Sequence, residues 1–185
     1  DMVAGHSLGE YAALMASGML EFRDALRAAA ARGTEMGSVE VRDNGLMASV
    51  SAPYEKVEEI LDRVDGYVIA ANRNSPRMTV IAGDTAAIKD AITRFDEAGV
   101  GCVILATSHA FHTRIVAPAN APLERFLKGL TIRLPSLPIT SNYDGQFYPM
   151  RCEEGFSTHE TILPQLAPQM SSPVEWITQI ENMHE

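Results

Sequence analysis

Several features that would place a protein in a specialised class are scarce in this sequence. It has two cysteines in 185 residues, and Cys102 and Cys152 stand fifty positions apart. Such a pair forms neither a disulfide framework nor a C-x-x-C metal or redox motif, which favours a reducing compartment. No apolar stretch approaches the roughly 18 residues that a membrane-spanning helix needs, and the N-terminus lacks a basic-then-apolar signal pattern. The sequence therefore predicts a soluble, cytoplasmic protein.

Basic residues are also in short supply. Lys and Arg number 15 against 24 Asp and Glu, which gives a formal net charge of −9. A negative field of this kind repels phosphate backbones and anionic membrane surfaces, so nucleic-acid binding and membrane association are disfavoured. The remaining composition, 46% hydrophobic and 21% charged, is that of an ordinary globular chain. Its length suits one domain, or a main domain with a small inserted one.

The periodicity of apolar residues predicts an α/β fold that is interrupted once. The chain opens in an apolar run without an initiator Met, so we expect a piece of a longer protein. Residues 45–106 alternate strand-like and helix-like segments in the order β-α-β-β-α-β, which is the ferredoxin-like signature. Residues 1–44 and 107–185 carry longer elements. We therefore predict an α/β body with an inserted ferredoxin-like subdomain.

Local signals refine this prediction. Within the inserted unit, residues 72–76 are rich in turn formers, Asp84 is expected to cap a helix, and residues 100–106 are typical of a buried strand. In the body, residues 115–127 are helix-like and residues 137–141 are strand-like. The first two helices carry apolar residues at helical spacing, namely Leu8, Tyr11, Ala12 and Met15 in one and Phe22, Ala25, Leu26, Ala29 and Met36 in the other.

The opening residues fit the nucleophile elbow, G-x-S-x-G. In Gly5-His6-Ser7-Leu8-Gly9 an apolar run leads into a helix, and small flanking residues permit the sharp turn that exposes a serine hydroxyl. Ser7 is therefore a candidate nucleophile, and the Leu8 backbone N–H at the helix N-terminus is a candidate oxyanion-hole donor. A serine that merely caps the helix is the alternative.

A nucleophilic serine needs a base, and the chain has five histidines. His109 and His112 directly follow the strand-like run, where α/β proteins display catalytic residues. The remaining histidines adjoin the serine in sequence or lie among polar residues. An H-x-x-H pair can also bind a metal ion, but no further ligand lies near it in sequence, so no metal site is expected.

Arg32 stands on the apolar stripe of the second predicted helix, three residues after Ala29 and four before Met36. A buried cation needs a partner. One possible partner is a structural carboxylate. The other is the carboxylate of a substrate, which the planar guanidinium would bind through two parallel hydrogen bonds.

Five segments together resemble one enzyme family: Gly5-His6-Ser7-Leu8-Gly9-Glu10, Arg32-Gly33, Gly45-Leu46-Met47-Ala48, Asn74-Ser75-Pro76 and His109-Ala110-Phe111-His112. Their joint spacing is similar to that of the malonyl-CoA:acyl carrier protein transacylase family, in the form of the acyltransferase domain of type I polyketide and polyunsaturated fatty acid synthases. The resemblance implies an α/β-hydrolase-like core with an inserted ferredoxin-like subdomain. It covers the middle of the domain, because the family's N-terminal Gly-Gln-Gly strand, which supplies a second oxyanion donor, and its closing Gly-Pro motif are absent.

The resemblance also implies a role for each matching residue. Ser7 matches the nucleophile, His112 the catalytic base, and Arg32 the arginine that holds the malonyl carboxylate. Gln169 matches a glutamine whose backbone carbonyl orients the histidine, and its side chain is expected to matter less.

The quartet at 109–112 resembles the malonyl-selective form of these domains, which places His109 and Phe111 at the substrate pocket. A phenyl ring there would fill the space that an α-methyl group requires. The implied donor is malonyl-CoA, and the implied acceptor is the phosphopantetheine thiol of an acyl carrier protein. Ketosynthase and other synthase domains of the same polypeptide are implied partners, and no metal or redox cofactor is needed.

Two other functions stay open at this point. An α/β-hydrolase esterase or thioesterase shares the elbow but has an Asp or Glu between the serine and the histidine in the chain. Asp84, Asp90 and Asp96 precede His112, but they fall in a segment predicted as a surface helix of the inserted unit. The second alternative is a non-catalytic fragment that docks a carrier protein.

Overall fold

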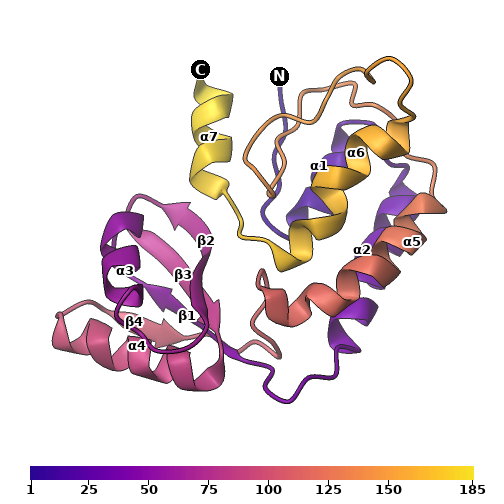
Figure 1. The fold of residues 1–185 in the computed structure, drawn as a ribbon. Coiled ribbons are helices and arrows are strands. Elements are labelled where there is room, and N and C mark those ends of the chain that lie inside the picture. Colours follow the sequence, from indigo (N-terminus) through magenta and orange to yellow (C-terminus); the bar gives the residue numbers. More distant parts are fainter.

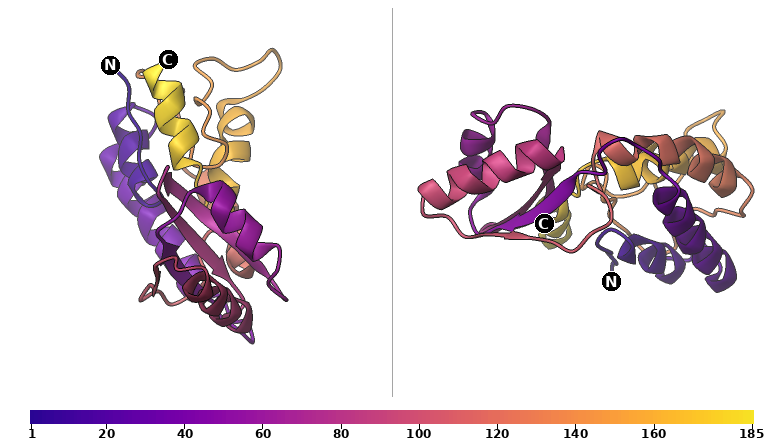
Figure 2. Two further views of the ribbon diagram at one scale, coloured as in Figure 1. Left: turned by 90° about the vertical axis from the view of Figure 1, so that its left-hand side faces the viewer. Right: turned by 90° about the horizontal axis from the view of Figure 1, so that it is seen from below.

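The computed structural model describes all 185 residues as two parts that lie side by side (Figure 1). A small unit of strands and helices lies at the lower left of the view, and the remaining helices form a larger body to its right, with α7 above the small unit. The view from below shows the same division (Figure 2, right). The middle of the chain builds the small unit, and the segments on either side of it build the body.

The inserted unit has the element order that the sequence predicts. It runs β1 (Leu46–Val50), α3 (Tyr54–Leu61), β2 (Val68–Ser75), β3 (Met78–Gly83), α4 (Thr85–Glu97) and β4 (Cys102–Ile104). The strands pair antiparallel in the order β2-β3-β1-β4. Both helices pack on one face of this sheet, around a core that includes Val57, Ile81, Ile88 and Phe95. The apolar stripes of α3 and α4 thus meet the alternate residues of the strands.

Two of the strands predicted for this unit are present, but their predicted bounds, and the burial predicted for the second, are wrong. Residues 72–75, which are rich in turn formers, extend β2, so that only two residues separate it from β3. The run at 100–106 forms a strand of three residues, β4, at the edge of the sheet. Val103 is 66% exposed there, because an edge strand has no neighbour to cover its outer side.

The cap of α4 comes from another segment than expected. Asp84 occupies the N-cap position, but its side chain makes no capping hydrogen bond. Instead Asp43, just before β1, accepts hydrogen bonds from the Thr85 backbone N–H at 2.8 Å and from the Gly45 N–H at 2.9 Å. Asp43 therefore ties the entry of the inserted unit to its second helix.

Helices dominate the body. They are α1 (Gly9–Ala16), α2 (Phe22–Gly37), η1 (Arg114–Ala119), α5 (Asn120–Lys128), α6 (Thr158–Leu166), η2 (Ala167–Ser171) and α7 (Trp176–His184). Together they enclose a cluster of 20 buried apolar residues. The helix expected over 115–127 is split into the 3₁₀ segment η1, which contains Pro118, and α5. None of the helices combines the length and apolar character that crossing a membrane requires.

Strand pairing in the body is sparse. It consists of a parallel bridge between Val3 and Ile139 and an antiparallel bridge between Thr140 and Phe147. The strand predicted over 137–141 is therefore reduced to single bridges. The parallel bridge still fixes the start of the elbow, because Val3 N donates to Pro138 O at 2.9 Å.

The first two helices bury only part of the apolar stripes that their spacing predicts, since Tyr11, Ala25 and Met36 are buried and other members are not. The buried face of α1 contains Tyr11 and Leu14. Leu8, Phe22 and Leu26 are 54%, 65% and 56% exposed. These three side chains line an apolar groove of about 260 Å³ between α1 and α2. Spacing alone thus indicates an amphipathic helix without showing which of two adjacent stripes faces the core.

A short strand-like contact joins the inserted unit to the body. Arg73 N donates to Val174 O at 3.0 Å, and Val174 N donates to Ala71 O at 2.8 Å. Next to this contact, His6 Nε2 lies 2.7 Å from Asn74 Oδ1. Helix α7 follows directly and stands beside β2 (Figure 1). The elbow and the sheet are thereby held on opposite sides of one cavity.

Candidate active site

Ser7 and His112 both lie on backbone turns that L-residues rarely adopt. Ser7 has a φ of 52° and His112 a φ of 60°, and no other non-glycine residue has a positive φ. Gly5 permits the first turn, because a Cβ at this position would lie 2.1 Å from Gly9 O. The predicted turn from an apolar run into a helix is therefore present. Conformations of this kind cost about 1–3 kcal/mol each and cluster at functional sites.

The two turns bring a hydroxyl and an imidazole together. Ser7 Oγ lies 2.8 Å from His112 Nε2. On the other side of the ring, Nδ1 lies 3.1 Å from the backbone oxygens of both Gln169 and Ser172. Carbonyl oxygens only accept hydrogen bonds, so Nδ1 carries the proton and Nε2 accepts from the Ser7 hydroxyl. The Gln169 carbonyl thus lies where it was expected, and the Ser172 carbonyl is a second partner that the sequence did not reveal.

Burial keeps this imidazole neutral. His112 is 3% exposed. Loss of solvation lowers its pKa from 6.5 to about 4, with the Arg32 charge as the next cause and the two carbonyl oxygens opposing the shift. At neutral pH the Nε2 lone pair is therefore available to take a proton from the hydroxyl.

The Leu8 N–H is placed to serve as an oxyanion donor. It makes no hydrogen bond within the chain, whereas the next N–H, that of Gly9, donates to His6 O at 2.9 Å. The Ser7 N–H is taken by Asn142 Oδ1 at 2.7 Å. Leu8 therefore offers the N–H of this turn that can meet a developing negative charge.

Arg32 is a buried cation without a counter-ion in contact. Its side chain is inward on α2, the residue is 5% exposed, and none of the ion pairs in the molecule includes it. Its Nη2 donates to Ser7 Oγ at 3.0 Å, and its Nε donates to Gln169 Oε1 at 3.3 Å. Burial lowers the pKa of Arg32. The sequence left two partners open for Arg32, a carboxylate of the protein or one of the substrate, and no carboxylate of the protein contacts it.

The Gln169 side chain also takes part in the site, although its backbone carbonyl was expected to matter more. Its Nε2 donates to Ser7 O at 2.8 Å and to Glu10 Oε2 at 2.9 Å. Glu10 is fully buried, and no role was assigned to it from the sequence, although it ends the first of the five segments that resemble the family. A further signal was its place as an acidic residue inside the first turn of a helix that packs on the core.

A cavity of about 310 Å³ opens in front of the serine and the histidine. The body contributes Ser7, His112 and Arg32, and Met47 of β1 and Asn72 of β2 face them from the inserted unit. The cavity is thus formed where the two parts of the molecule meet. Phe111 also lines it, as the malonyl-selective pattern implies.

His109 does not line this cavity. Its Nε2 lies 3.2 Å from Val39 O, and its Nδ1 lies 3.1 Å from Ser108 Oγ. The ring stands next to Phe111, with ring centroids 6.1 Å apart. His109 therefore lies outside the cavity and next to Phe111, and its contact with substrate stays a prediction. No group of three or more His, Cys, Asp or Glu side chains is arranged to hold a metal ion.

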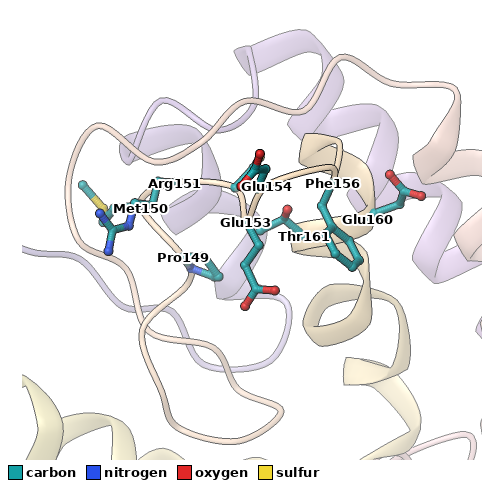
Figure 3. A pocket seen from close by; sticks show the side chains of 9 residues that line it. Pro149, Met150, Arg151, Glu153, Glu154, Phe156, Glu160 and Thr161 are labelled. Atoms are coloured by element: carbon teal, nitrogen blue, oxygen red, sulfur yellow. The ribbon is translucent and has the colours of Figure 1, made fainter.

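The largest hollow of the molecule lies elsewhere (Figure 3). It has a volume of about 1090 Å³ and is formed by residues 149–156 and the start of α6. Its lining includes Glu153, Glu154 and Glu160 but no pair of a nucleophile and a base in contact. The smaller cavity with Ser7 and His112 is therefore the candidate active site.

Residues 1–174 match the model of a family described as "Acyl transferase domain". The chain belongs to this family. Over 185 aligned residues this acyltransferase chain is 37% identical to the polyketide biosynthesis protein ThaF of Burkholderia thailandensis, an alignment that covers 99% of the chain and 15% of that protein. Over 188 residues it is 32% identical to the malonyl CoA-acyl carrier protein transacylase of Escherichia coli K12, which covers 98% of the chain and 58% of that protein.

Solved structures show the same fold. The acyl-carrier-protein S-malonyltransferase of Burkholderia pseudomallei superposes with a TM-score of 0.89 at 31% identity, covering 99% of this acyltransferase chain and 58% of the other. The mixed α/β fold is therefore that of the acyltransferase family. The chain spans about three fifths of the length of both transacylases.

Proposed function

We propose that this chain carries the malonyl-transferring centre of an acyltransferase, which moves a malonyl group from malonyl-CoA to the phosphopantetheine thiol of an acyl carrier protein. One observation carries the proposal. Arg32 is a 5% exposed guanidinium that touches the nucleophile, lines the cavity and has no carboxylate partner. The terminal carboxylate of a malonyl group supplies the partner that this buried cation lacks.

The first half-reaction uses the contact between Ser7 and His112 and the unpaired N–H of Leu8. Ser7 Oγ attacks the thioester carbon while its proton passes to His112 Nε2, which lies 2.8 Å away. The Leu8 N–H donates to the oxygen that becomes negative in the tetrahedral intermediate. The C–S bond then breaks, the leaving sulfur takes the proton from His112, and malonyl-Ser7 and free coenzyme A result.

The second half-reaction is the reverse with another thiol. His112 takes the proton from the phosphopantetheine thiol, and the sulfur attacks the ester carbon of malonyl-Ser7. The C–O bond breaks, and Ser7 Oγ recovers its proton from His112. Because the acyl group moves between two similar thioesters, the reaction requires no metal or redox cofactor.

The same proposal includes an assignment of the two domains and of the kind of protein to which the chain belongs. We assign residues 1–44 and 107–185 to an α/β-hydrolase-like core and residues 45–106 to a ferredoxin-like subdomain. The antiparallel order β2-β3-β1-β4 supports the second assignment. The parent protein would be a cytoplasmic synthase in which ketosynthase and other domains use the loaded carrier.

The esterase alternative is disfavoured by the partners of His112. A hydrolase triad needs a carboxylate at Nδ1, but that atom lies 3.1 Å from two backbone oxygens. The three aspartates considered for that role, Asp84, Asp90 and Asp96, lie in α4 of the inserted unit or at its N-cap. Asp90 pairs with Arg94 along α4.

Incubation of the chain with malonyl-CoA, followed by intact-mass measurement, separates the candidate functions. We expect a malonyl adduct that disappears on addition of a carrier protein bearing phosphopantetheine, with malonyl-carrier as the product. Ser7→Ala should abolish the adduct. Release of free malonate without an adduct would indicate a hydrolase, and an unmodified chain with unconsumed malonyl-CoA would indicate a non-catalytic fragment.

A further inference from the structure

Glu10 is a buried carboxylate that the proposed reaction does not use. It lies one turn after the nucleophile on α1 and is 0% exposed. Its Oε1 accepts hydrogen bonds from the Tyr148 hydroxyl at 2.7 Å and from the Asn142 backbone N–H at 3.2 Å. Its Oε2 accepts from Gln169 Nε2 at 2.9 Å. All three partners donate to it, and no cation forms an ion pair with it, so its arrangement resembles that of an acceptor built into the site.

Gln169 links this carboxylate to Arg32. Its Oε1 accepts from Arg32 Nε at 3.3 Å, while its Nε2 donates to Glu10 Oε2 and to Ser7 O. Arg32 can only donate, and the ionised carboxylate of Glu10 and the carbonyl of Ser7 can only accept. The side-chain amide of Gln169 therefore satisfies its neighbours in one of its two orientations only.

We propose that Glu10 is a positioning residue that fixes the orientation of the Gln169 amide and, through it, aims the Arg32 guanidinium at the carboxylate of the acyl group. This inference rests on the proposed function, because it assigns Glu10 to the selection of malonyl over uncharged acyl groups. The reacting atoms themselves stay with Ser7 and His112. Loss of Glu10 should therefore change which acyl group is used more than it changes the chemistry.

The variant Glu10→Gln keeps the size of the side chain and replaces one of its two acceptor oxygens by an NH₂ donor. A glutamine at position 10 can keep its oxygen on the Asn142 N–H, which is backbone and fixed, but then its NH₂ faces Gln169 Nε2. Gln169 can relieve this contact between two donors by turning its amide over. It then presents its own NH₂ to Arg32 Nε and its oxygen to Ser7 O, so the guanidinium loses its acceptor and the Ser7 carbonyl loses its donor.

The readout is the ratio of kcat/KM for malonyl-CoA to that for acetyl-CoA. We expect Glu10→Gln to lower this ratio about tenfold, mainly through a higher KM for malonyl-CoA, and to retain acetyl transfer. Tyr148→Phe is the matched control. It removes another donor from the same carboxylate but touches neither Gln169 nor Arg32, so the ratio should stay within about twofold of the wild-type value.

A double-mutant cycle tests the path through Gln169. Gln169→Met keeps the backbone carbonyl that faces His112 and removes the amide, so it should lower the ratio by a similar factor. In the Gln169→Met background, Glu10→Gln should then change the ratio no further. If the two effects multiply, or if Glu10→Gln alone leaves the ratio unchanged, Glu10 does not act through Gln169 and the inference is overturned.

Two further results keep the inference apart from the function on which it rests. If the unmodified chain shows no preference for malonyl-CoA that depends on Arg32, the proposed function fails and the inference fails with it. If that preference is present but is insensitive to Glu10→Gln, only the inference fails. If Glu10→Gln does not fold, Glu10→Asp replaces it in the test. This variant keeps the charge but moves the carboxylate away from Gln169, so it should lower the ratio of kcat/KM for malonyl-CoA to that for acetyl-CoA. An unchanged ratio would overturn the inference.

Discussion

In the proposed reaction, Phe111 is the residue that we expect to limit the size of the acyl group, because it lines the cavity. It lines the cavity next to His112, and the His109 ring lies beside it with ring centroids 6.1 Å apart. Phe111→Ser should raise the use of methylmalonyl-CoA relative to malonyl-CoA by about tenfold, because one methyl group in a pocket decides about 1–3 kcal/mol. Competition between the two thioesters measures the ratio.

The control for this change is another phenylalanine of the same chain. Phe22 is 65% exposed on α2 and does not line the active-site cavity. Phe22→Ser should leave the ratio unmoved. A preference for methylmalonyl-CoA in the unmodified chain would show that Phe111 does not set the choice.

Arg32 also acts on the base. Its charge is the second cause, after burial, of the lowered pKa of His112. Arg32→Gln should therefore raise the pKa of His112 above about 4, as followed by the NMR titration of its ring protons. Arg27→Gln, on the same helix but exposed and paired with Asp24, should leave it unchanged. A lower pKa for His112 in Arg32→Gln would contradict this electrostatic account.

At the scale of elements, the elbow depends on a close approach of backbone to backbone. A Cβ on Gly5 would lie 2.1 Å from Gly9 O and 2.5 Å from Glu10 N, and neither atom can move without displacing α1. Gly5→Ala should lower the free energy of unfolding by at least about 2 kcal/mol. A Cβ on Gly9 meets nothing within 4 Å, so Gly9→Ala is the matched control and should be neutral or slightly stabilising. Urea denaturation measures the free energy of unfolding of both variants, and equal values would refute the steric argument.

The inserted unit could be predicted from sequence because its signals are local. Alternating strand residues and the apolar stripes of α3 and α4 lie within about 60 residues, so periodicity alone gave the element order found in the structure. Edge position is not a local property. The apolar run at 100–106 was therefore expected to be buried, whereas Val103 lies on the open side of β4.

The site could be predicted only where a motif marked it. The glycine pattern around Ser7 and the H-x-x-H pair were visible in the sequence, and the structure brings Ser7 and His112 together. Glu10 and Asn142 were missed because their roles come from segments more than 130 positions apart that meet only in the fold, with the Asn142 N–H donating to Glu10 Oε1. His109 and Phe111 are only two positions apart, but the sequence did not show that Phe111 lines the cavity and that His109 lies outside it.

At the scale of the whole molecule, two buried groups make stability depend on pH in opposite directions. Burial raises the pKa of Glu10 from 4.5 to about 7, against the opposing effects of Tyr148, Asn142, Gln169 and Arg32. Between these values the folded chain holds a proton that the unfolded chain has lost, so this contribution falls as pH rises. The lowered pKa of His112 acts in the opposite sense, and its contribution is present above pH 6.5 and lost as pH falls toward 4.

Comparison with Glu10→Gln separates the two contributions, because the variant keeps His112. The free energy of unfolding of the wild type minus that of the variant should fall by about 3 kcal/mol between pH 4.5 and pH 8, since each pKa unit corresponds to about 1.4 kcal/mol. Urea denaturation across this range measures it. A difference that stays constant with pH would show that the pKa of Glu10 is not raised in the folded chain.

The central claim is that Ser7 takes up a malonyl group whose carboxylate Arg32 holds. The most direct test is to offer the chain equimolar malonyl-CoA and acetyl-CoA and to measure, by peptide mass, which acyl group Ser7 carries. In the unmodified chain malonyl-Ser7 should predominate, and Arg32→Ala should shift the partition toward acetyl by about one to two orders of magnitude, because a hydrogen bond to a charged group is worth about 1.5–3 kcal/mol. An unchanged partition in Arg32→Ala, or an acyl group on a residue other than Ser7, would contradict the account.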